Sequence, residues 1–345
     1  MDGAERKLRG AIVGLGRMGL THLAILRSHP DVAELALVEA SACLGRAVGT
    51  QLGLSWYSTM EELLLGGRPD FLVVATPTRF HYQVASAALE NRIPVFIEKP
   101  LSLSPNESRM LARAAAEQHV VAQVGYVNRF NEIFVAVRSL LRSGDLGQLT
   151  HVSCEIRSPM VMKTTDSSWR SKDSEGGGSL HDIAAHGIDL LNYIAGPPQE
   201  VIGSSMQSMV SRQVEDRVEV LFGYRGFTGS LHVNWSDPSC RKPAYRLVID
   251  SQRGRIIADQ HAYKVFRTFP VAGRQANSWQ TVYITDIAQP VRMYVRGNEF
   301  TRQLDHFIAS LGDDRLEPVN TLESALETDE VIERIRRSAK IVRPQ

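Results

Sequence analysis

The sequence has few cysteines, almost no net charge and no long apolar segment. Its three cysteines, Cys43, Cys154 and Cys240, lie far apart, which predicts neither a disulfide framework nor a zinc site. A formal net charge of +1 gives no electrostatic reason to expect nucleic acid or a membrane surface as a partner. No apolar run approaches the ~18 residues of a membrane-spanning helix, and the first residues lack the apolar core of a signal peptide. We therefore expect a cytoplasmic protein with no metal site.

The chain of 345 residues is 43% hydrophobic and 22% charged, a composition typical of globular proteins large enough for two domains. Within residues 1–125, strand-like apolar runs alternate with helical patterns, which predicts an α/β domain with a parallel sheet. The expected strands are Leu8–Val13, Leu35–Val38, Phe71–Ala75, Pro94–Ile97 and Val120–Val124. Between them we expect helices, one of which begins with Ser104 as its N-cap.

The pattern changes after residue 125. Helices are expected at 131–143 and 179–195, and several extended runs, separated by Gly and Pro turns, fill the rest of residues 126–320. This predicts an α+β substrate domain with a large, mostly antiparallel open sheet. Alternate residues of the runs at 149–157 and 227–235 are polar, which favours a sheet face that meets solvent or another subunit. A polar amphipathic helix within 321–345 is expected to pack back near the N-terminal domain.

A glycine loop, Gly14-Leu15-Gly16-Arg17-Met18-Gly19, follows the first strand-like run. Gly14 permits a tight turn, Gly16 lets the backbone approach a pyrophosphate, and Gly19 lets the next helix pack closely on the strand. Glu39 ends the next strand-like run, twenty positions after Gly19, where a carboxylate accepts hydrogen bonds from an adenosine ribose. The sequence therefore predicts a Rossmann domain that binds NAD, with NADP disfavoured because Glu39 repels a 2′-phosphate.

Two further loops follow the next buried strands, at 75–78 and at Glu98-Lys99-Pro100. Ligands of open α/β sheets gather beyond the carboxyl ends of the strands, so these loops should meet the glycine loop. Lys99 is the group among them suited to acid–base work or to polarising a hydroxyl, and the following proline fixes its turn. A surface lysine is the alternative interpretation.

A second candidate site lies in the other half of the chain, where three glycines at 176–178 precede a helix. Asp182, His186 and Asp189 have the spacing of one helical face, and a histidine beside a carboxylate suits general acid–base catalysis. Structural alternatives stay open: Ser179 and Asp182 could form a capping pair, and His186 could be a core histidine held by Asp189.

Together these motifs resemble the glucose–fructose oxidoreductase / inositol dehydrogenase / rhizopine-catabolism (Gfo/Idh/MocA) family over nearly the whole chain. The motifs that carry the resemblance are the glycine loop, Ala75-Thr76-Pro77-Thr78 with His81, Glu98-Lys99-Pro100-Leu101, Gln123-Val124-Gly125-Tyr126 with Arg129-Phe130, Trp169-Arg170, and Asp182 with His186. The resemblance implies a catalytic trio of Lys99, Asp182 and His186. It also implies cofactor contacts from Gly14, Gly16, Arg17, Met18, Glu39, Thr76, Pro77, His81, Glu98 and Lys99. Many relatives carry Asp where this chain has Glu39.

The resemblance implies an NAD-dependent dehydrogenase that oxidises a secondary hydroxyl of a sugar or cyclitol, or runs the reverse reduction. Alternatives are a carbonyl or imine reductase or a nucleotide-sugar dehydrogenase of the same family and, in another class, a non-catalytic NAD-binding regulator. Candidate substrate contacts are Arg129, Arg157, Trp169 and Asn234. We also expect a homodimer or homotetramer formed through the C-terminal sheet, and no nucleic acid or membrane partner.

Overall fold

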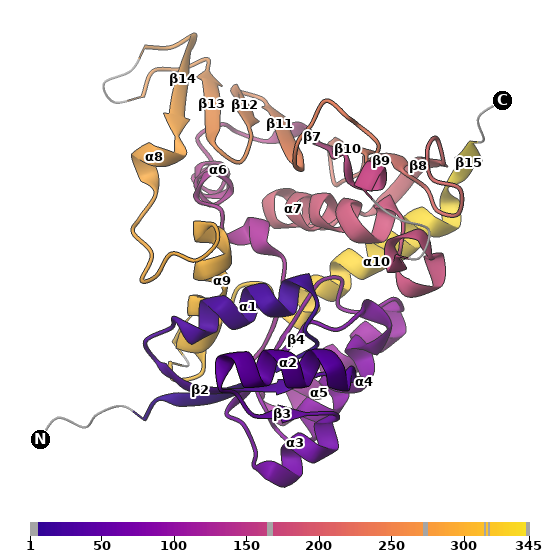
Figure 1. Ribbon diagram of the computed structural model, residues 1–345. Coiled ribbons are helices and arrows are strands. Elements are labelled where there is room, and N and C mark those ends of the chain that lie inside the picture. The colour runs from indigo at the N-terminus through magenta and orange to yellow at the C-terminus, as the bar shows by residue number, and fades with distance from the viewer. Residues whose placement is uncertain (1–5, 164–167, 272–274, 314, 317, 343–345) are drawn as a thin grey trace, which may run out of the picture. The chain divides into compact units, whose positions relative to one another are not determined.

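The computed structural model describes residues 6–163, 168–271, 275–313, 315–316 and 318–342. The chain forms two compact units, coloured by residue number in Figure 1. The first unit contains the chain up to Val127 together with Pro290–Leu326, and the second contains Asn128–Gln289 and the chain from Glu327 onward. The first segment of this unit ends at Val127, two residues beyond the boundary expected from the sequence. Segment 290–326, in contrast, which the sequence analysis assigned almost entirely to the substrate domain, belongs to the first unit.

The first unit is built on a six-stranded parallel sheet with the order β3-β2-β1-β4-β5-β6. Its strands are β1 (Leu8–Val13), β2 (Val32–Val38), β3 (Trp56–Tyr57), β4 (Phe71–Val74), β5 (Val95–Ile97) and β6 (Ala122–Val124). Its helices are α1 (Arg17–Arg27), α2 (Ala42–Leu52), α3 (Met60–Gly66), α4 (His81–Glu90), α5 (Pro105–Gln118) and, from far along the chain, α9 (Asn298–Ser310). This strand order is that of a Rossmann domain, as predicted.

Helix α9 completes the core of this Rossmann unit. Its Leu304, Phe307 and Ile308 are buried in the same apolar cluster as Phe71 of β4 and Phe96 of β5. The ring of Phe307 packs edge-on against both phenylalanines, with centroid distances of 6.0 and 5.8 Å. The first unit therefore depends on a helix from the segment Pro290–Leu326, far along the chain from Val127, where its first segment ends.

Side chains cap several helices at their first turns. Ser41, Thr59 and Asn131 accept hydrogen bonds from the first turns of α2, α3 and α6 (Glu132–Arg142). Ser104 is the N-cap residue of α5, as predicted, but its side chain makes no cap hydrogen bond. Instead Ser102 Oγ accepts from Ser104 N at 3.0 Å and donates to Ser104 O at 2.6 Å, so the neighbouring serine holds the turn.

The second unit is built on a nine-stranded mixed sheet with the order β14-β13-β12-β11-β7-β10-β9-β8-β15. The strands are β7 (Leu149–Arg157), β8 (Glu200–Gln207), β9 (Arg217–Gly223), β10 (Thr228–Asn234), β11 (Ala244–Ser251), β12 (Gly254–Ala258), β13 (Ala262–Arg267), β14 (Ser278–Tyr283) and β15 (Lys340–Val342). Its helices are α6 (Glu132–Arg142), α7 (Ala185–Ala195), α8 (Ile284–Ile287) and most of α10 (Leu322–Ser338). Most pairs are antiparallel, as predicted, but β7 and β10, and also β8 and β15, run parallel.

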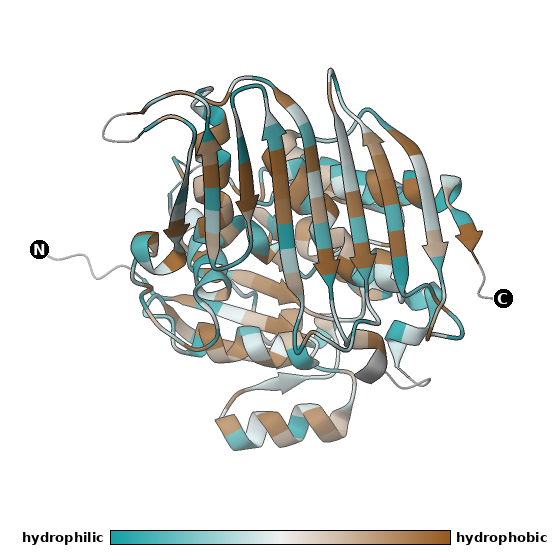
Figure 2. Ribbon diagram, turned by 90° about the horizontal axis from the view of Figure 1, so that it is seen from above, coloured by the Kyte–Doolittle hydropathy of each residue, from teal (hydrophilic) through white to brown (hydrophobic). Residues whose placement is uncertain are grey.

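The two faces of this sheet differ in polarity, which Figure 2 shows as alternating colours along the strands. Cys154 and Ile156 of β7 and Leu231 of β10 lie on the face that packs against α7, where Gly187 gives them room. On the opposite face of the sheet, the parallel register of β7 and β10 places two polar rows side by side. These rows are His151, Ser153, Glu155 and Arg157 of β7, next to Thr228, Ser230, His232 and Asn234 of β10.

Among the described residues, no helix has both the length and the apolar character needed to cross a membrane.

Candidate functional site

The glycine loop has the geometry that the sequence predicts for a dinucleotide site. Gly14 has a φ of +92°, which favours glycine. A Cβ on Gly19 would lie 1.9 Å from the carbonyl oxygen of Gly14, so only glycine allows α1 to start this close to β1. A Cβ on Gly16 would meet no atom within 4 Å, and no side chain caps α1 at this residue. The first turn of α1 thus presents backbone N–H groups beside open space, as a pyrophosphate requires.

Glu39 lies at the carboxyl end of β2, next to this loop. One carboxylate oxygen accepts from Leu15 N at 2.9 Å, and the other accepts from Ser41 N at 2.9 Å. The backbone therefore orients the carboxylate at the place where a Rossmann domain binds the adenosine ribose.

The loop after β4 carries Thr76 and leads to His81. The hydroxyl oxygen of Thr76 is buried and has no hydrogen-bond partner among the described residues, which suits a group that contacts a bound cofactor. His81 is only 1% exposed. Its ring nitrogens lie 2.9 Å from Pro100 O and 3.0 Å from Thr76 O. His81 therefore joins the loops after β4 and β5 from inside the protein, and the cofactor contact expected of it from the sequence stays a prediction. Burial lowers the pKa of His81, and the two carbonyl oxygens oppose this effect.

Glu98 and Lys99 follow β5. The buried carboxylate of Glu98 lies 2.7 Å from His22 Nε2 of α1, and its other oxygen accepts from Lys99 N at 3.2 Å. A Cβ on Gly125 would lie 3.2 Å from this carboxylate, so the glycine after β6 makes room for it. The peptide bond from Lys99 to Pro100 is cis. Glu98 thus connects α1 to the loop that carries Lys99.

In the second unit, Asp182 lies in a π-helical turn, Leu180–Ala184, that continues into α7, which carries His186. Asp182 is 9% exposed and accepts from Arg170 Nε at 2.9 Å. The Arg170 guanidinium lies 4.4 Å from the centroid of the Trp169 ring. The capping alternative for Ser179 and Asp182 is wrong, because the side chain of Ser179 makes no cap hydrogen bond.

Asp189 belongs to a buried ion pair with Arg129. Both carboxylate oxygens of Asp189 accept from Arg129, at 2.7 to 3.1 Å, and Arg129 also lies 5.4 Å from the centroid of the Tyr193 ring. Burial raises the pKa of Asp189, and Arg129 opposes this effect. Arg129 is therefore buried and bound on two sides, and the substrate contact expected of it from the sequence stays a prediction.

The other candidate substrate residues have mixed surroundings. Arg157 pairs with Glu155 at 2.5 Å and with Asp237 at 3.3 Å. Asn234 Oδ1 accepts from both the N–H and the hydroxyl of Ser236, which fixes the end of β10. Arg157 and Trp169 remain partly exposed.

Glu215, which no sequence motif indicated, holds the start of the π-helical turn. Its carboxylate accepts from Leu180 N at 2.7 Å, and its carbonyl oxygen accepts from Ser179 N at 3.0 Å. Burial raises the pKa of Glu215 to about 7, and the charges of Asp173 and Asp216 add to that effect. Glu215 and Leu180 are 35 positions apart, so no local pattern pointed to this contact.

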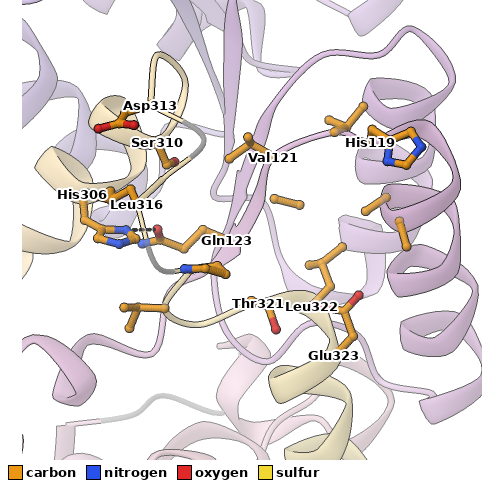
Figure 3. Close-up of a pocket in the computed structure, with 16 residues that line it drawn as sticks. His119, Val121, Gln123, His306, Ser310, Asp313, Leu316, Thr321, Leu322 and Glu323 are labelled. Carbon is orange, nitrogen blue, oxygen red and sulfur yellow. Dashed lines mark hydrogen bonds between the residues drawn. The ribbon is translucent and has the colours of Figure 1, made fainter.

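A pocket of about 340 Å³ lies at the edge strand β6 of the first unit (Figure 3). It is bordered by the end of α5, the start of β6, α9 and the start of α10. Gln123 and His306 face each other in it, with Oε1 and Nδ1 3.0 Å apart. Its lining includes no residue of the loops after β1, β2, β4 and β5, so this pocket is separate from the dinucleotide site.

In the part of the chain that the structure describes, no group of three or more His, Cys, Asp or Glu side chains could hold a metal ion.

Comparison with protein families covers both halves of the chain. Residues 8–126 match the model of the GFO_IDH_MocA oxidoreductase family with its NAD-binding Rossmann fold, and residues 134–257 match the C-terminal domain model of the same family. The chain belongs to the Gfo/Idh/MocA family. As a member of this family it is an oxidoreductase, and its first unit is an NAD-binding Rossmann domain.

Two curated relatives show how far the similarity extends. A protein of Amycolatopsis mediterranei (strain S699), described as a putative UDP-kanosamine synthase oxidoreductase subunit, is 28% identical over 327 residues, or 89% of each chain. The scyllo-inositol 2-dehydrogenase (NAD(+)) of Bacillus subtilis (strain 168) is 29% identical, but only over 56% of this chain and 55% of that enzyme.

Solved structures share the fold over nearly the whole chain. GenD2 from gentamicin A biosynthesis, in complex with NAD, is 24% identical with a TM-score of 0.80 and covers 98% of this chain and 95% of its own. Levoglucosan dehydrogenase in complex with NADH is 19% identical with a TM-score of 0.84, and the match covers 96% of each chain.

Proposed function

We propose that this Gfo/Idh/MocA protein is an NAD-dependent dehydrogenase that oxidises a secondary hydroxyl of a sugar or cyclitol, or catalyses the reverse reduction. The observation that carries the proposal is the position of Lys99 directly after β5, in the NAD-binding unit of a chain whose relatives include an inositol dehydrogenase. Lys99 begins the loop that Glu98 and His81 hold from inside the protein. This support suits a side chain that must keep one position during a reaction.

In the proposed mechanism, Lys99, Asp182 and His186 act on one substrate. His186 takes the proton of the reacting hydroxyl, and Lys99 donates a hydrogen bond to the same oxygen and stabilises its growing negative charge. Asp182, oriented by Arg170, holds the neighbouring hydroxyl. Bound NAD would supply the hydride acceptor for oxidation and the donor for reduction.

The residues around the glycine loop fit NAD. Gly14, Gly16 and Gly19 leave the backbone of the first α1 turn accessible, Glu39 would bind the adenosine ribose, and Thr76 would contact the cofactor through its buried hydroxyl.

A nucleotide-linked sugar is the second candidate substrate class. It is favoured by the similarity, over 89% of both chains, to the relative whose name includes a UDP-sugar synthase. A simple cyclitol is favoured by the inositol dehydrogenase, although that match spans about half of each chain.

The decisive experiment is a turnover assay that follows NADH with free sugars, cyclitols and UDP-sugars as separate groups. Activity in any group supports the dehydrogenase, and the group with the highest kcat/KM identifies the substrate class. Tight NAD binding without turnover in either direction would instead favour a non-catalytic regulator.

A variant of Lys99 tests its role once a substrate is found. Lys99→Met keeps the length of the side chain but removes its charge and its donor, so kcat should fall by roughly a hundredfold or more. The Kd for NAD should change far less. Lys264→Met, which alters an exposed lysine of β13, is the matched control and should retain full activity. Near-normal turnover of Lys99→Met would remove Lys99 from the mechanism.

We further propose a homo-oligomer that forms through the polar face of the large sheet. Sedimentation of the native chain and of a variant with His232→Ala and Ser230→Ala, both on that face, should show a shift toward smaller species in the variant.

A further inference from the structure

Arg296 lies in the segment that precedes α9 and reaches the first turns of α1. Its Nη1 donates to Thr21 Oγ1 at 2.7 Å, and Thr21 Oγ1 donates to the carbonyl oxygen of Arg17 at 2.9 Å. The guanidinium also lies 4.9 Å from the centroid of the Phe300 ring. These contacts hold a second arginine beside Arg17, the residue that begins α1 directly after Gly16.

In the described part of the chain, neither Arg296 nor Arg17 forms an ion pair with a carboxylate, although Glu299 and Glu98 act on the charge of Arg296 from further away. Burial lowers the pKa of Arg296, and the positive charge of Arg17 acts in the same direction, against weaker effects of Glu299 and Glu98. A partly buried guanidinium next to a second one is electrostatically unfavourable until an anion lies between them.

Arg292, only four residues earlier, shows the opposite arrangement. Its guanidinium pairs with Asp31 at 2.6 Å and with Asp305 at 3.3 Å. The same short segment therefore provides Arg292, which forms ion pairs within the first unit, and Arg296, which forms none among the described residues.

We propose that Arg296 and Arg17 form a two-arginine phosphate site at the first turn of α1. Arg296 would then be a binding residue that the glycine motif does not contain, supplied by the segment at 290–326 that joins the first unit late in the chain. The phosphate has two possible sources, the pyrophosphate of NAD or the phosphate of a nucleotide-linked substrate. The second source rests on the proposed function.

Binding assays with Arg296→Ala distinguish the two sources without any need for turnover. If the site holds the cofactor, the Kd for both NAD and ADP-ribose, which has the pyrophosphate but no nicotinamide, should rise about tenfold, as expected when one hydrogen bond to a charged group is lost. If the site holds a substrate phosphate, the Kd for NAD should stay unchanged. In that case inorganic phosphate should raise the Tm of the NAD-saturated native protein, and this effect should be absent in Arg296→Ala.

Matched variants separate lost binding from lost folding. Without ligand, Arg296→Ala should melt close to the native Tm, because the loss of the contacts with Thr21 and Phe300 is offset by the relief of repulsion from Arg17. Arg292→Ala should melt lower, since it breaks two ion pairs, and should bind NAD and ADP-ribose normally. Arg296→Lys should retain part of the affinity because it keeps the charge but not the forked geometry. Normal binding of NAD and ADP-ribose by Arg296→Ala, together with an unchanged response to phosphate, would overturn the proposal.

Discussion

At the scale of single residues, Glu39 gives the clearest test of cofactor choice. Its carboxylate is held by Leu15 N and Ser41 N, so it does not move away easily from an approaching 2′-phosphate. We expect kcat/KM to be clearly higher with NAD than with NADP, and Glu39→Ser to narrow the ratio by improving NADP and weakening NAD. Glu34→Gln, on the exposed side of β2, should leave the ratio unchanged. A native preference for NADP would contradict the assignment of Glu39.

His186 is the residue whose role predicts the pH dependence of catalysis. A general base must be neutral, so oxidation should slow toward acid pH as the imidazole gains a proton, whereas reduction should benefit from the protonated form. His186→Ala should lose most activity in both directions. Its residual oxidation rate should no longer fall toward acid pH, that is, the acid limb of the pH profile should be absent. The measurement is kcat/KM against pH in each direction. Retention of both turnover and the acid limb would leave His186 as a structural residue, and Lys99 would become the candidate base.

Residue roles were predictable where the chemistry is local. The glycines of the loop, the carboxylate at the end of β2, and the caps at Ser41 and Thr59 all follow from neighbours a few positions away. The buried ion pair of Arg129 could not be predicted in this way, because its partner Asp189 lies 60 positions further along the chain. An isolated arginine looks the same in a sequence whether it will bind substrate or a buried carboxylate.

At the scale of elements, the segment that carries Asp182 begins in an unusual way. Its first turn is π-helical, and its first N–H groups are satisfied by Glu215 instead of by a residue of the helix itself. Single π-helical turns are often found at functional sites, where they change the direction of a side chain. Glu215 is thus a positioning residue for the turn that presents Asp182.

The raised pKa of Glu215 predicts a pH-dependent stability. Between its ordinary value of 4.5 and its folded value of about 7, the folded protein holds one proton more than the unfolded chain. The free energy of unfolding should therefore fall as pH rises through this window, by about 3 kcal/mol at most. Above the window it should level off. Glu215→Gln keeps the acceptor for Leu180 N but cannot ionise, so its stability should vary less with pH in urea unfolding.

The control for this prediction is Glu200→Gln, which removes an exposed carboxylate from β8. The free energy of unfolding of Glu200→Gln should vary with pH in the same way as that of the native chain. Equal pH dependence for the native protein and Glu215→Gln would mean that Glu215 does not titrate in this range.

Most helices and strands with a clear hydrophobic period were predicted from the sequence, whereas strands near one edge of the large sheet were not. Strands β7 and β10 alternate between buried and more exposed residues, and both were located from the sequence. Strands β13 and β14 lie toward one edge of the sheet, are mostly half-exposed, and lack that contrast. Helix α9 was missed although Phe300, Leu304, Phe307 and Ile308 have helical spacing, so its pattern could have revealed it.

At the scale of the whole molecule, the chain enters the first unit twice. The sequence suggests consecutive domains because motif order follows chain order, and nothing local shows that 290–326 returns to the Rossmann sheet. Burial shows it instead: Leu304 and Phe307 are fully buried in the cluster that contains Phe71 and Phe96. The cofactor-binding unit is therefore completed only after the second unit has been traversed.

This arrangement predicts that a substitution near the end of the chain weakens the NAD-binding unit. Phe307→Ala removes a fully buried ring and should destabilise the first unit by about 3–5 kcal/mol. NAD raises the Tm of the unit that binds it, so thermal unfolding with and without NAD identifies that transition, and Phe307→Ala should lower it. Phe134→Ala removes an equally buried ring from α6 of the second unit and should lower the transition that does not respond to NAD. If Phe134→Ala instead lowered the NAD-responsive transition as much as Phe307→Ala, the division of the chain into these two units would not describe its unfolding.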